Sequence, residues 1–223
     1  MYFCSMKYVY PYRRSCSKFD TLHHSITWLK LFDPQAEVYI VGDPHPDGIH
    51  IPISTLPIRG CDVTNKMMHF AWHYAGTFCY MNDDFFIGPN YRFDRILSNG
   101  DLVINDRHAP TYQEAMQNTI DFLKSVGKPM VNFECHQPIL MDSDKLIGLF
   151  DRITWKQHNH FIKSMYLNYY GCEHTLGENL KVANEIIKAQ EFLSLYGSFS
   201  TSDTWFNQKA QREYITKRLA YSA

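Results

Sequence analysis

Two adjacent carboxylates are the clearest chemical signal in this sequence. Asp83 and Asp84 follow Asn82 at the end of the apolar run Thr77–Met81, and a second apolar run, Phe85–Ile87, comes directly after them. Like charges that lose water repel each other unless a cation lies between them. Mg²⁺ and Mn²⁺ usually bind one or two protein carboxylates and complete their shell with phosphate oxygens and water. We expect Asp83 and Asp84 to hold such a divalent cation; an Asx-type turn is the alternative interpretation.

Basic and polar side chains elsewhere in the chain could bind the phosphates of a substrate. Arginine and lysine donate charge-assisted hydrogen bonds to phosphate oxygens, and their charge stabilises a leaving nucleoside diphosphate. The alternative for an arginine pair in a turn is a solvated surface. The residues we expect at a donor-binding site are Arg13, Arg14, Asp43, Asn65, Lys66, Asn82 and Asp83.

A transferase also needs a group that removes the proton of its acceptor. His136 lies between the apolar run Met130–Phe133 and Pro138, and a neutral imidazole accepts protons near pH 7. Carboxylates engaged by a metal are poor bases, because the charge of the ion lowers their basicity. We therefore expect three catalytic residues: His136 as base, Asp84 at the metal, and Asp203 as the reserve candidate for the base. Most single histidines have structural roles, and ten others compete with this one.

Alternating strand and helix patterns in the first half predict how these residues are positioned. Short apolar, β-branched runs predict strands, and apolar residues at helical spacing after Asp, Ser or Thr predict helices. Consecutive strands joined by helices form parallel units, whose loops meet at the carboxyl edge of the sheet. We expect strands at Met1–Tyr10, Glu37–Val41, Ile49–Ile53 and Thr77–Met81, with helices from Asp20 or Thr21 to Phe32 and from Thr64 to Tyr74.

The second half of the sequence favours helices. One added strand is expected at Leu102–Asn105, and Gly197–Asp203 is expected to be a polar loop. The expected helices are Tyr112–Val126, Ser143–Ile153, Asn159–Tyr170, Leu180–Phe192 and Thr204–Leu219. The predicted fold class is therefore α/β, with a mostly parallel, Rossmann-like central sheet flanked by helices and a helical C-terminal half. We treat residues 1–223 as one domain, with a donor-binding part at 1–105 and an acceptor-side part at 106–223.

Composition narrows the function classes. The 223 residues include 22 Lys and Arg against 23 Asp and Glu, for a formal net charge of −1. The sequence therefore has no overall positive charge that would indicate nucleic acid or an anionic membrane as a partner. The sequence shows no signal peptide and no apolar stretch of the roughly 20 residues that span a bilayer, so we expect a cytoplasmic protein.

Several of these motifs together resemble the Stealth family. This family includes capsular polysaccharide phosphotransferases and the lysosomal-enzyme N-acetylglucosamine-1-phosphotransferase. The stretch from about Arg13 to Gly88, above all the Tyr80–Gly88 motif, is similar to the family's second block, and the segment from Cys135 to Phe150 looks like the third. Phe199–Asp203 resembles the short fourth block more weakly. The family's usual opening block, of the Tyr-Thr-Trp-Val-Asp type, is not recognisable near Met6–Tyr12.

The resemblance implies a glycosyltransferase-A-like sheet, a nucleotide-sugar donor, a metal at Asp83 and Asp84, and a working His136. Our first hypothesis is a metal-dependent glycosyltransferase with a UDP-sugar as the favoured donor and Mg²⁺ or Mn²⁺ as cofactor. Its acceptor would be a carbohydrate or another hydroxyl compound, with a modified DNA base not excluded. One alternative is a Stealth-type sugar-1-phosphate transferase that releases a nucleoside monophosphate. The other is a non-catalytic module that binds carbohydrate or nucleotide.

Overall fold

The computed structural model describes residues 6–14, 20–183, 185–202, 205 and 208–221. Its main sheet has five strands in the order β3-β2-β1-β4-β7. These are β1 (Lys7–Tyr12), β2 (Glu37–Gly42), β3 (Ile49–Pro52), β4 (Thr77–Tyr80) and β7 (Ile139–Asp142). β1, β2, β3 and β4 run parallel, whereas β7 pairs antiparallel with β4. The predicted α/β class with a parallel-rich sheet is confirmed.

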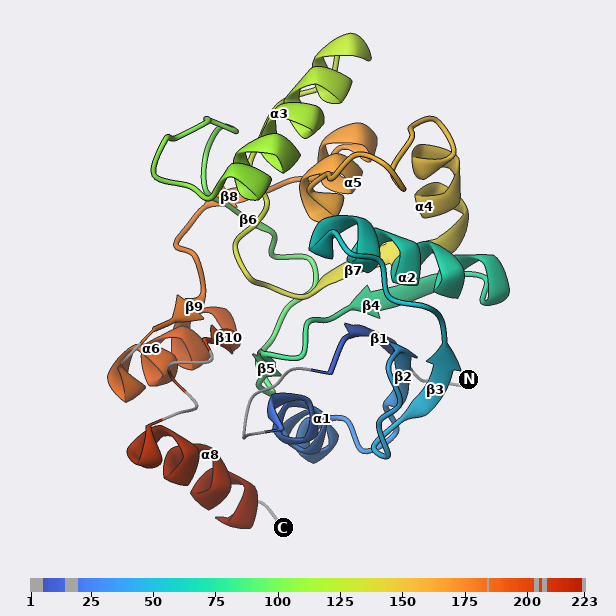
Figure 1. Ribbon diagram of the computed structural model, residues 1–223. Helices are drawn as coiled ribbons and strands as arrows, with labels where there is room; N and C mark the ends of the chain where they lie inside the picture. Colours follow the sequence, from blue (N-terminus) through green and yellow to red (C-terminus); the bar gives the residue numbers. More distant parts are fainter. Residues whose placement is uncertain (1–5, 15–19, 184, 203–204, 206–207, 222–223) are drawn as a thin grey trace.

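Helices cover both faces of this sheet (Figure 1). Side chains alternate along β1, so Tyr8 and Tyr10 pack in one core cluster with Leu22 and Ile26 of α1 (Thr21–Phe32). On the opposite face, Val9 packs in a second cluster with residues of α2 (Arg59–His73). α1 begins as predicted, because Asp20 accepts a hydrogen bond from the His23 amide at 2.9 Å.

A small second sheet lies beside the main one, in the order β5-β10-β9. Its strands are β5 (Phe85–Ile87), β10 (Ser198–Thr201) and β9 (Lys181–Val182). β5 begins at Phe85, immediately after Asp84, so the second sheet holds the C-terminal end of the acidic motif in place. Trp28 of α1 ties the two parts together by packing edge-on against Phe86 and Phe199 and donating to the Ile87 carbonyl at 2.9 Å.

The remaining elements belong mostly to the second half of the chain. A short parallel pair joins β6 (Leu97–Ser98) to β8 (Thr175–Leu176). The helices are α3 (Pro110–Ser125), α4 (Ser143–Phe150), α5 (Ile162–Tyr170), α6 (Ile186–Tyr196) and α8 (Lys209–Tyr221). None of the helices in the described ranges is both long and apolar enough to cross a membrane.

Three expected assignments were wrong. Leu102–Asn105 forms no strand, and the first residues of the expected helix Leu180–Phe192 form the strand β9, so that α6 begins only at Ile186. In the segment expected to be a polar loop, residues 198–201 form the buried strand β10, because Ser200 and Thr201 satisfy their backbone groups in the second sheet. Because these side chains carry hydroxyl groups, the sequence pattern did not predict a buried strand here.

Two element boundaries also needed correction. β1 continues through Pro11 to Tyr12, where the Tyr12 carbonyl accepts from the Asp43 amide at 3.2 Å. The backbone of Pro11, like that of Val9, is directed toward β4, but β4 ends before it reaches Pro11. The N–H that proline lacks therefore removes no hydrogen bond from the sheet. α2 begins at Arg59 instead of Thr64. The sequence pattern did not predict this first turn, because it contains Gly60 and has no side-chain cap.

Candidate functional site

The order of the main sheet determines where a ligand site is expected. The chain runs outward from β1 to β3 and then returns to the other side of β1 as β4. In open α/β sheets, such a change of direction leaves a crevice at the carboxyl ends of the two central strands. Arg13 and Arg14 follow β1 at this position, and the Asn82–Asp84 motif follows β4.

A cavity of about 460 Å³ occupies this position, and we call it the main cavity. It brings together the predicted residues Arg13, Arg14, Asn82, Asp83 and Asp84. The other lining residues are Pro11, Thr21, Arg59, Asp62, Val63, Lys181, Thr201 and Ser202. The main cavity therefore combines four cationic side chains with the two adjacent carboxylates and with Asp62.

Asp84 has one oxygen engaged and one without a hydrogen bond. Its Oδ2 accepts from the Ser200 hydroxyl at 3.0 Å and lies 3.6 Å from Lys181 Nζ. Its Oδ1 is buried and makes no hydrogen bond within the described part of the chain. Burial raises the pKa of this carboxyl, and the charge of Lys181 opposes that shift. A buried carboxylate oxygen without a partner is unfavourable unless a ligand completes its coordination.

The residues present fit a divalent cation that is completed by its substrate. The Thr201 hydroxyl oxygen, also on the cavity wall, is likewise buried without a hydrogen bond among the described residues. No cluster of three or more His, Cys, Asp or Glu side chains that could hold a metal occurs in the residues that the structure describes. A cation here would take ligands from Asp83, Asp84 and phosphate oxygens, which is the usual arrangement for Mg²⁺.

Lys66 lies beneath the main cavity, outside its wall. It is fully buried in the middle of α2, not on a first turn as the sequence indicated, and its Nζ donates to the Tyr12 carbonyl at 2.8 Å and to Asp62 Oδ2 at 2.6 Å. Gly42, at φ +123°, makes room for it, because a Cβ there would lie 2.5 Å from Lys66 Cε. Lys66 thus fixes the end of β1 and orients Asp62, which lines the cavity.

The predicted donor-site residues Asp43 and Asn65 also lie outside the wall of the main cavity. Asp43 accepts a hydrogen bond from the Arg14 amide at 2.7 Å, and the Arg14 guanidinium donates to the Pro44 carbonyl at 3.3 Å. Asp43 therefore holds the loop that carries Arg14. Asn65 is buried within α2.

His136 lies outside the wall of the main cavity and has an unusual backbone conformation. Its φ of +51° lies in the left-handed region, which is uncommon for a residue other than glycine. Its Nδ1 lies 2.8 Å from Asn179 Oδ1; since that oxygen can only accept, Nδ1 carries the proton. Burial, together with the charges of Lys163 and Lys181, lowers the pKa of His136 to about 3, so the ring is neutral and weakly basic. The reserve base, Asp203, lies outside the described residues.

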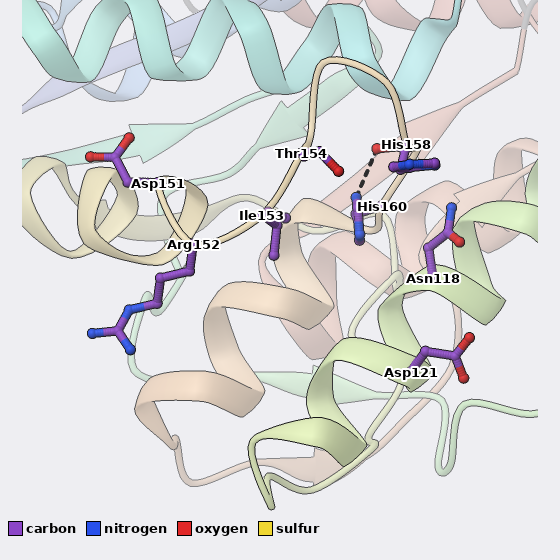
Figure 2. Close-up of a pocket in the computed structure, with 8 residues that line it drawn as sticks. All are labelled: Asn118, Asp121, Asp151, Arg152, Ile153, Thr154, His158 and His160. Carbon is purple, nitrogen blue, oxygen red and sulfur yellow. Dashed lines mark hydrogen bonds between the residues drawn. The ribbon is translucent and has the colours of Figure 1, made fainter.

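Two further hollows adjoin one another at a shared lining residue. The first, which we call the side pocket, has a volume of about 260 Å³ and shares Arg59, Val63 and Asn82 with the main cavity. The second is an open hollow of about 490 Å³ between α3 and the loop at 151–160 (Figure 2). His160 lines both of these hollows, and its Nδ1 is hydrogen-bonded to the His158 carbonyl at 2.8 Å.

Six polar residues of the main cavity were not predicted as site residues, among them Thr21, which was assigned only to the start of a helix. Arg59 and Asp62 were missed because α2 was expected to begin later, and Lys181 because it was assigned to a helix. Thr201 and Ser202 were part of the expected loop, from which only Asp203 was selected. The hydroxyl-rich sequence Ser200-Thr201-Ser202 was the available signal for the last two.

Comparisons with known proteins leave the family open. No protein-family model matches the chain, and no curated protein matches it. One solved structure with similarity is the crystal structure of a glycosyltransferase involved in the glycosylation of the major capsid of PBCV-1. The two share 6% sequence identity and a TM-score of 0.35, over 96% of this chain and 100% of that one. A likeness at this level defines neither fold family nor activity, and the resemblance to the Stealth family stays a prediction.

Proposed function

We propose that this protein is a glycosyltransferase that uses a nucleotide sugar and a divalent cation. The observation that carries the proposal is the main cavity, which is also lined by Arg13, Arg14, Arg59 and Lys181 and where the buried Oδ1 of Asp84 has no hydrogen bond among the described residues. An acidic pair with four surrounding cations suits a diphosphate that arrives with Mg²⁺ or Mn²⁺.

Each group has a distinct part in this proposal. Asp83 and Asp84 would hold the cation, which supplies Lewis-acid stabilisation of the diphosphate when bound. The Arg13 and Arg14 guanidinium groups, positioned by Asp43, would donate to phosphate oxygens. Arg59 stands on the first turn of α2, whose N-terminus has no side-chain cap and carries a partial positive charge. Together these groups stabilise the negative charge that develops on the leaving nucleoside diphosphate.

The Stealth-like motifs support a second candidate that uses the same cavity. In that reaction the acceptor attacks the phosphorus next to the sugar, so that a sugar phosphate is transferred and a nucleoside monophosphate leaves. We favour transfer of the sugar, with a UDP-sugar as the first donor to test. The acceptor classes are a carbohydrate, another hydroxyl compound or a modified DNA base.

A thermal-shift screen of UDP-, GDP- and ADP-sugars tests donor binding. In Mn²⁺, one nucleotide class should stabilise the protein by about 2.7 kcal/mol at 100 times its Kd, and so raise Tm by roughly 5–10 °C for a chain of this size. The rise should vanish in EDTA and shrink in Arg14→Ala.

Arg107→Ala is the matched control, because this exposed arginine lines none of the three hollows and should respond like the wild type. Stabilisation that is equal in EDTA and Mn²⁺ would rule out the metal role. A screen without any stabilising nucleotide sugar would reject the proposal as a whole.

A further inference from the structure

The side pocket opens beside the carboxylate motif and is lined mainly by later parts of the chain. Arg59, Val63 and Asn82 form the boundary that it shares with the main cavity. Its other walls come from α2, β4, α3, the loop that leads into α5, the start of α5, and Glu134, which lies in irregular structure. A molecule bound in the side pocket would therefore reach the main cavity across Asn82.

The lining of the side pocket suits a small, hydroxyl-bearing molecule. Tyr112 and Phe161 contribute aromatic rings, with centroids 4.6 Å apart. The Asn159 side chain is buried against Gly60, and its Oδ1 makes no hydrogen bond among the described residues, so the polar acceptor on the wall is the carboxylate of Glu134. The volume of about 260 Å³ is below the roughly 300–1,000 Å³ of sites for drug-sized ligands. A single sugar ring matches this size and chemistry better than a nucleotide does.

Glu134 is held in a fixed orientation on this wall. Its Oε1 accepts from the Ser164 amide at 3.2 Å and from the Ser164 hydroxyl at 3.0 Å, and these two bonds hold that oxygen in place. Its Oε2 lies 3.7 Å from the buried Lys163 Nζ, beyond normal hydrogen-bond length. Unlike His136, Glu134 lines the side pocket directly.

We propose that the side pocket binds the acceptor as a single sugar residue and that Glu134 is the base that takes the proton of its hydroxyl. This inference rests on the proposed glycosyl transfer and adds the acceptor class and a catalytic residue. In the reaction, the acceptor oxygen forms a bond to the anomeric carbon as the bond from that carbon to the diphosphate oxygen breaks. The proton moves to Glu134, and the electron pair leaves with the nucleoside diphosphate.

The pocket is tested by filling it from an exposed position. Thr111 lines the side pocket at the start of α3, and its contact with Asn159 uses only its backbone carbonyl, so Thr111→Trp keeps that hydrogen bond. Transfer from the donor found by thermal shift to a panel of methyl glycosides should fall at least about tenfold in Thr111→Trp, as expected when an acceptor is displaced from its reactive position. Gln117→Trp, exposed on the same helix and lining none of the hollows, should transfer like the wild type.

The base is tested with azide, an anionic nucleophile that has no proton to lose. Glu134→Gln should lower transfer to the methyl glycoside by about two to four powers of ten, the usual contribution of general base catalysis. Its donor-induced Tm shift should stay unchanged. With azide in place of the acceptor, Glu134→Gln should form glycosyl azide at a rate close to that of the wild type.

Three outcomes would overturn the inference while leaving the proposed function in place. The first is donor binding by the wild type with none of the methyl glycosides accepted. The second is wild-type transfer in Thr111→Trp. The third is a folded Glu134→Gln that transfers to the methyl glycoside at the wild-type rate, or that forms glycosyl azide much more slowly than the wild type does. If the proposed function itself is wrong, no nucleotide sugar will raise the Tm of the wild type, which distinguishes that failure from these three outcomes.

Discussion

Asp84 places a carboxylate where water is largely excluded, with the half-exposed Lys181 as its cationic neighbour at 3.6 Å. Burial raises the pKa of this carboxyl above its ordinary value of 3.8. The folded protein therefore binds the proton more tightly than the unfolded chain does, and stability is lost as the pH rises above 3.8. At neutral pH the charge of Asp84 destabilises the ligand-free protein.

Asp84→Asn should consequently stabilise the protein in EDTA at pH 7, by about 1 kcal/mol or roughly 2–4 °C in Tm. The side-chain amide can still accept from Ser200, and the half-exposed Lys181 loses little. The difference from the wild type should disappear below pH 3.8, where both side chains are neutral. Melting curves across this pH range provide the measurement, and a variant that melts lower than the wild type in EDTA at pH 7 would contradict the account of Asp84.

At the scale of residues, sequence reasoning located the acidic motif and the arginine pair but not their partners. Asp83, Asp84, Arg13 and Arg14 follow strands that the apolar pattern identifies, and the loops after parallel strands meet at one edge. Glu134 had no such signal, since it lies in irregular structure. Side chains brought together from distant segments have no local pattern that marks them.

At the scale of elements, one buried ion pair connects the first turns of α2 to the end of β1. Lys66 bridges Asp62 on its own helix and the Tyr12 carbonyl, and it is fully buried. Both ends of this connection border the main cavity, because Asp62 lines it and Tyr12 precedes Arg13. The position of the Arg13–Arg14 loop therefore depends on this contact.

Lys66→Met should destabilise the protein by about 3–5 kcal/mol, because it leaves the Asp62 charge buried without its cation. The double variant Asp62→Asn/Lys66→Met should recover much of that loss, since it removes both charges. Urea unfolding measures each free energy, with Lys124→Met at an exposed position of α3 as control. A loss below about 1 kcal/mol for Lys66→Met, the scale of an exposed pair, would mean that this contact does not hold β1 and α2 together.

The ends of helices and strands were predictable where a side chain caps the helix or where apolar side chains mark the strand, and not elsewhere. Asp20 caps α1, so its start was located, whereas α2 starts without a side-chain cap and was placed five residues late. β10 was missed because Ser198, Ser200 and Thr201 are polar by type yet buried. Their burial follows from pairing with β5 and β9, which no local pattern in the segment indicates.

At the scale of the whole molecule, the main cavity is built from both halves of the chain. Residues from β1, α2 and the loop after β4 form one part of its wall, and Lys181, Thr201 and Ser202 from the second half complete it. Among the described residues, the second half also supplies β7 to the main sheet and the strands β8, β9 and β10 outside it, in addition to its helices. Two of these, β10 and β9, form the second sheet with β5 (Figure 1), and β5 directly follows the acidic motif.

The nucleotide released during transfer tests the central claim most directly. We predict that the wild-type protein, supplied with the donor identified by thermal shift, Mn²⁺ and an accepted methyl glycoside, releases one nucleoside diphosphate for each sugar transferred. Asp83→Asn should lower that rate by about two powers of ten or more, as expected when an electrostatic stabiliser of the transition state is lost. Arg107→Ala should release nucleotide at the wild-type rate. Release of a nucleoside monophosphate instead would contradict glycosyl transfer and assign the cavity to transfer of a sugar phosphate.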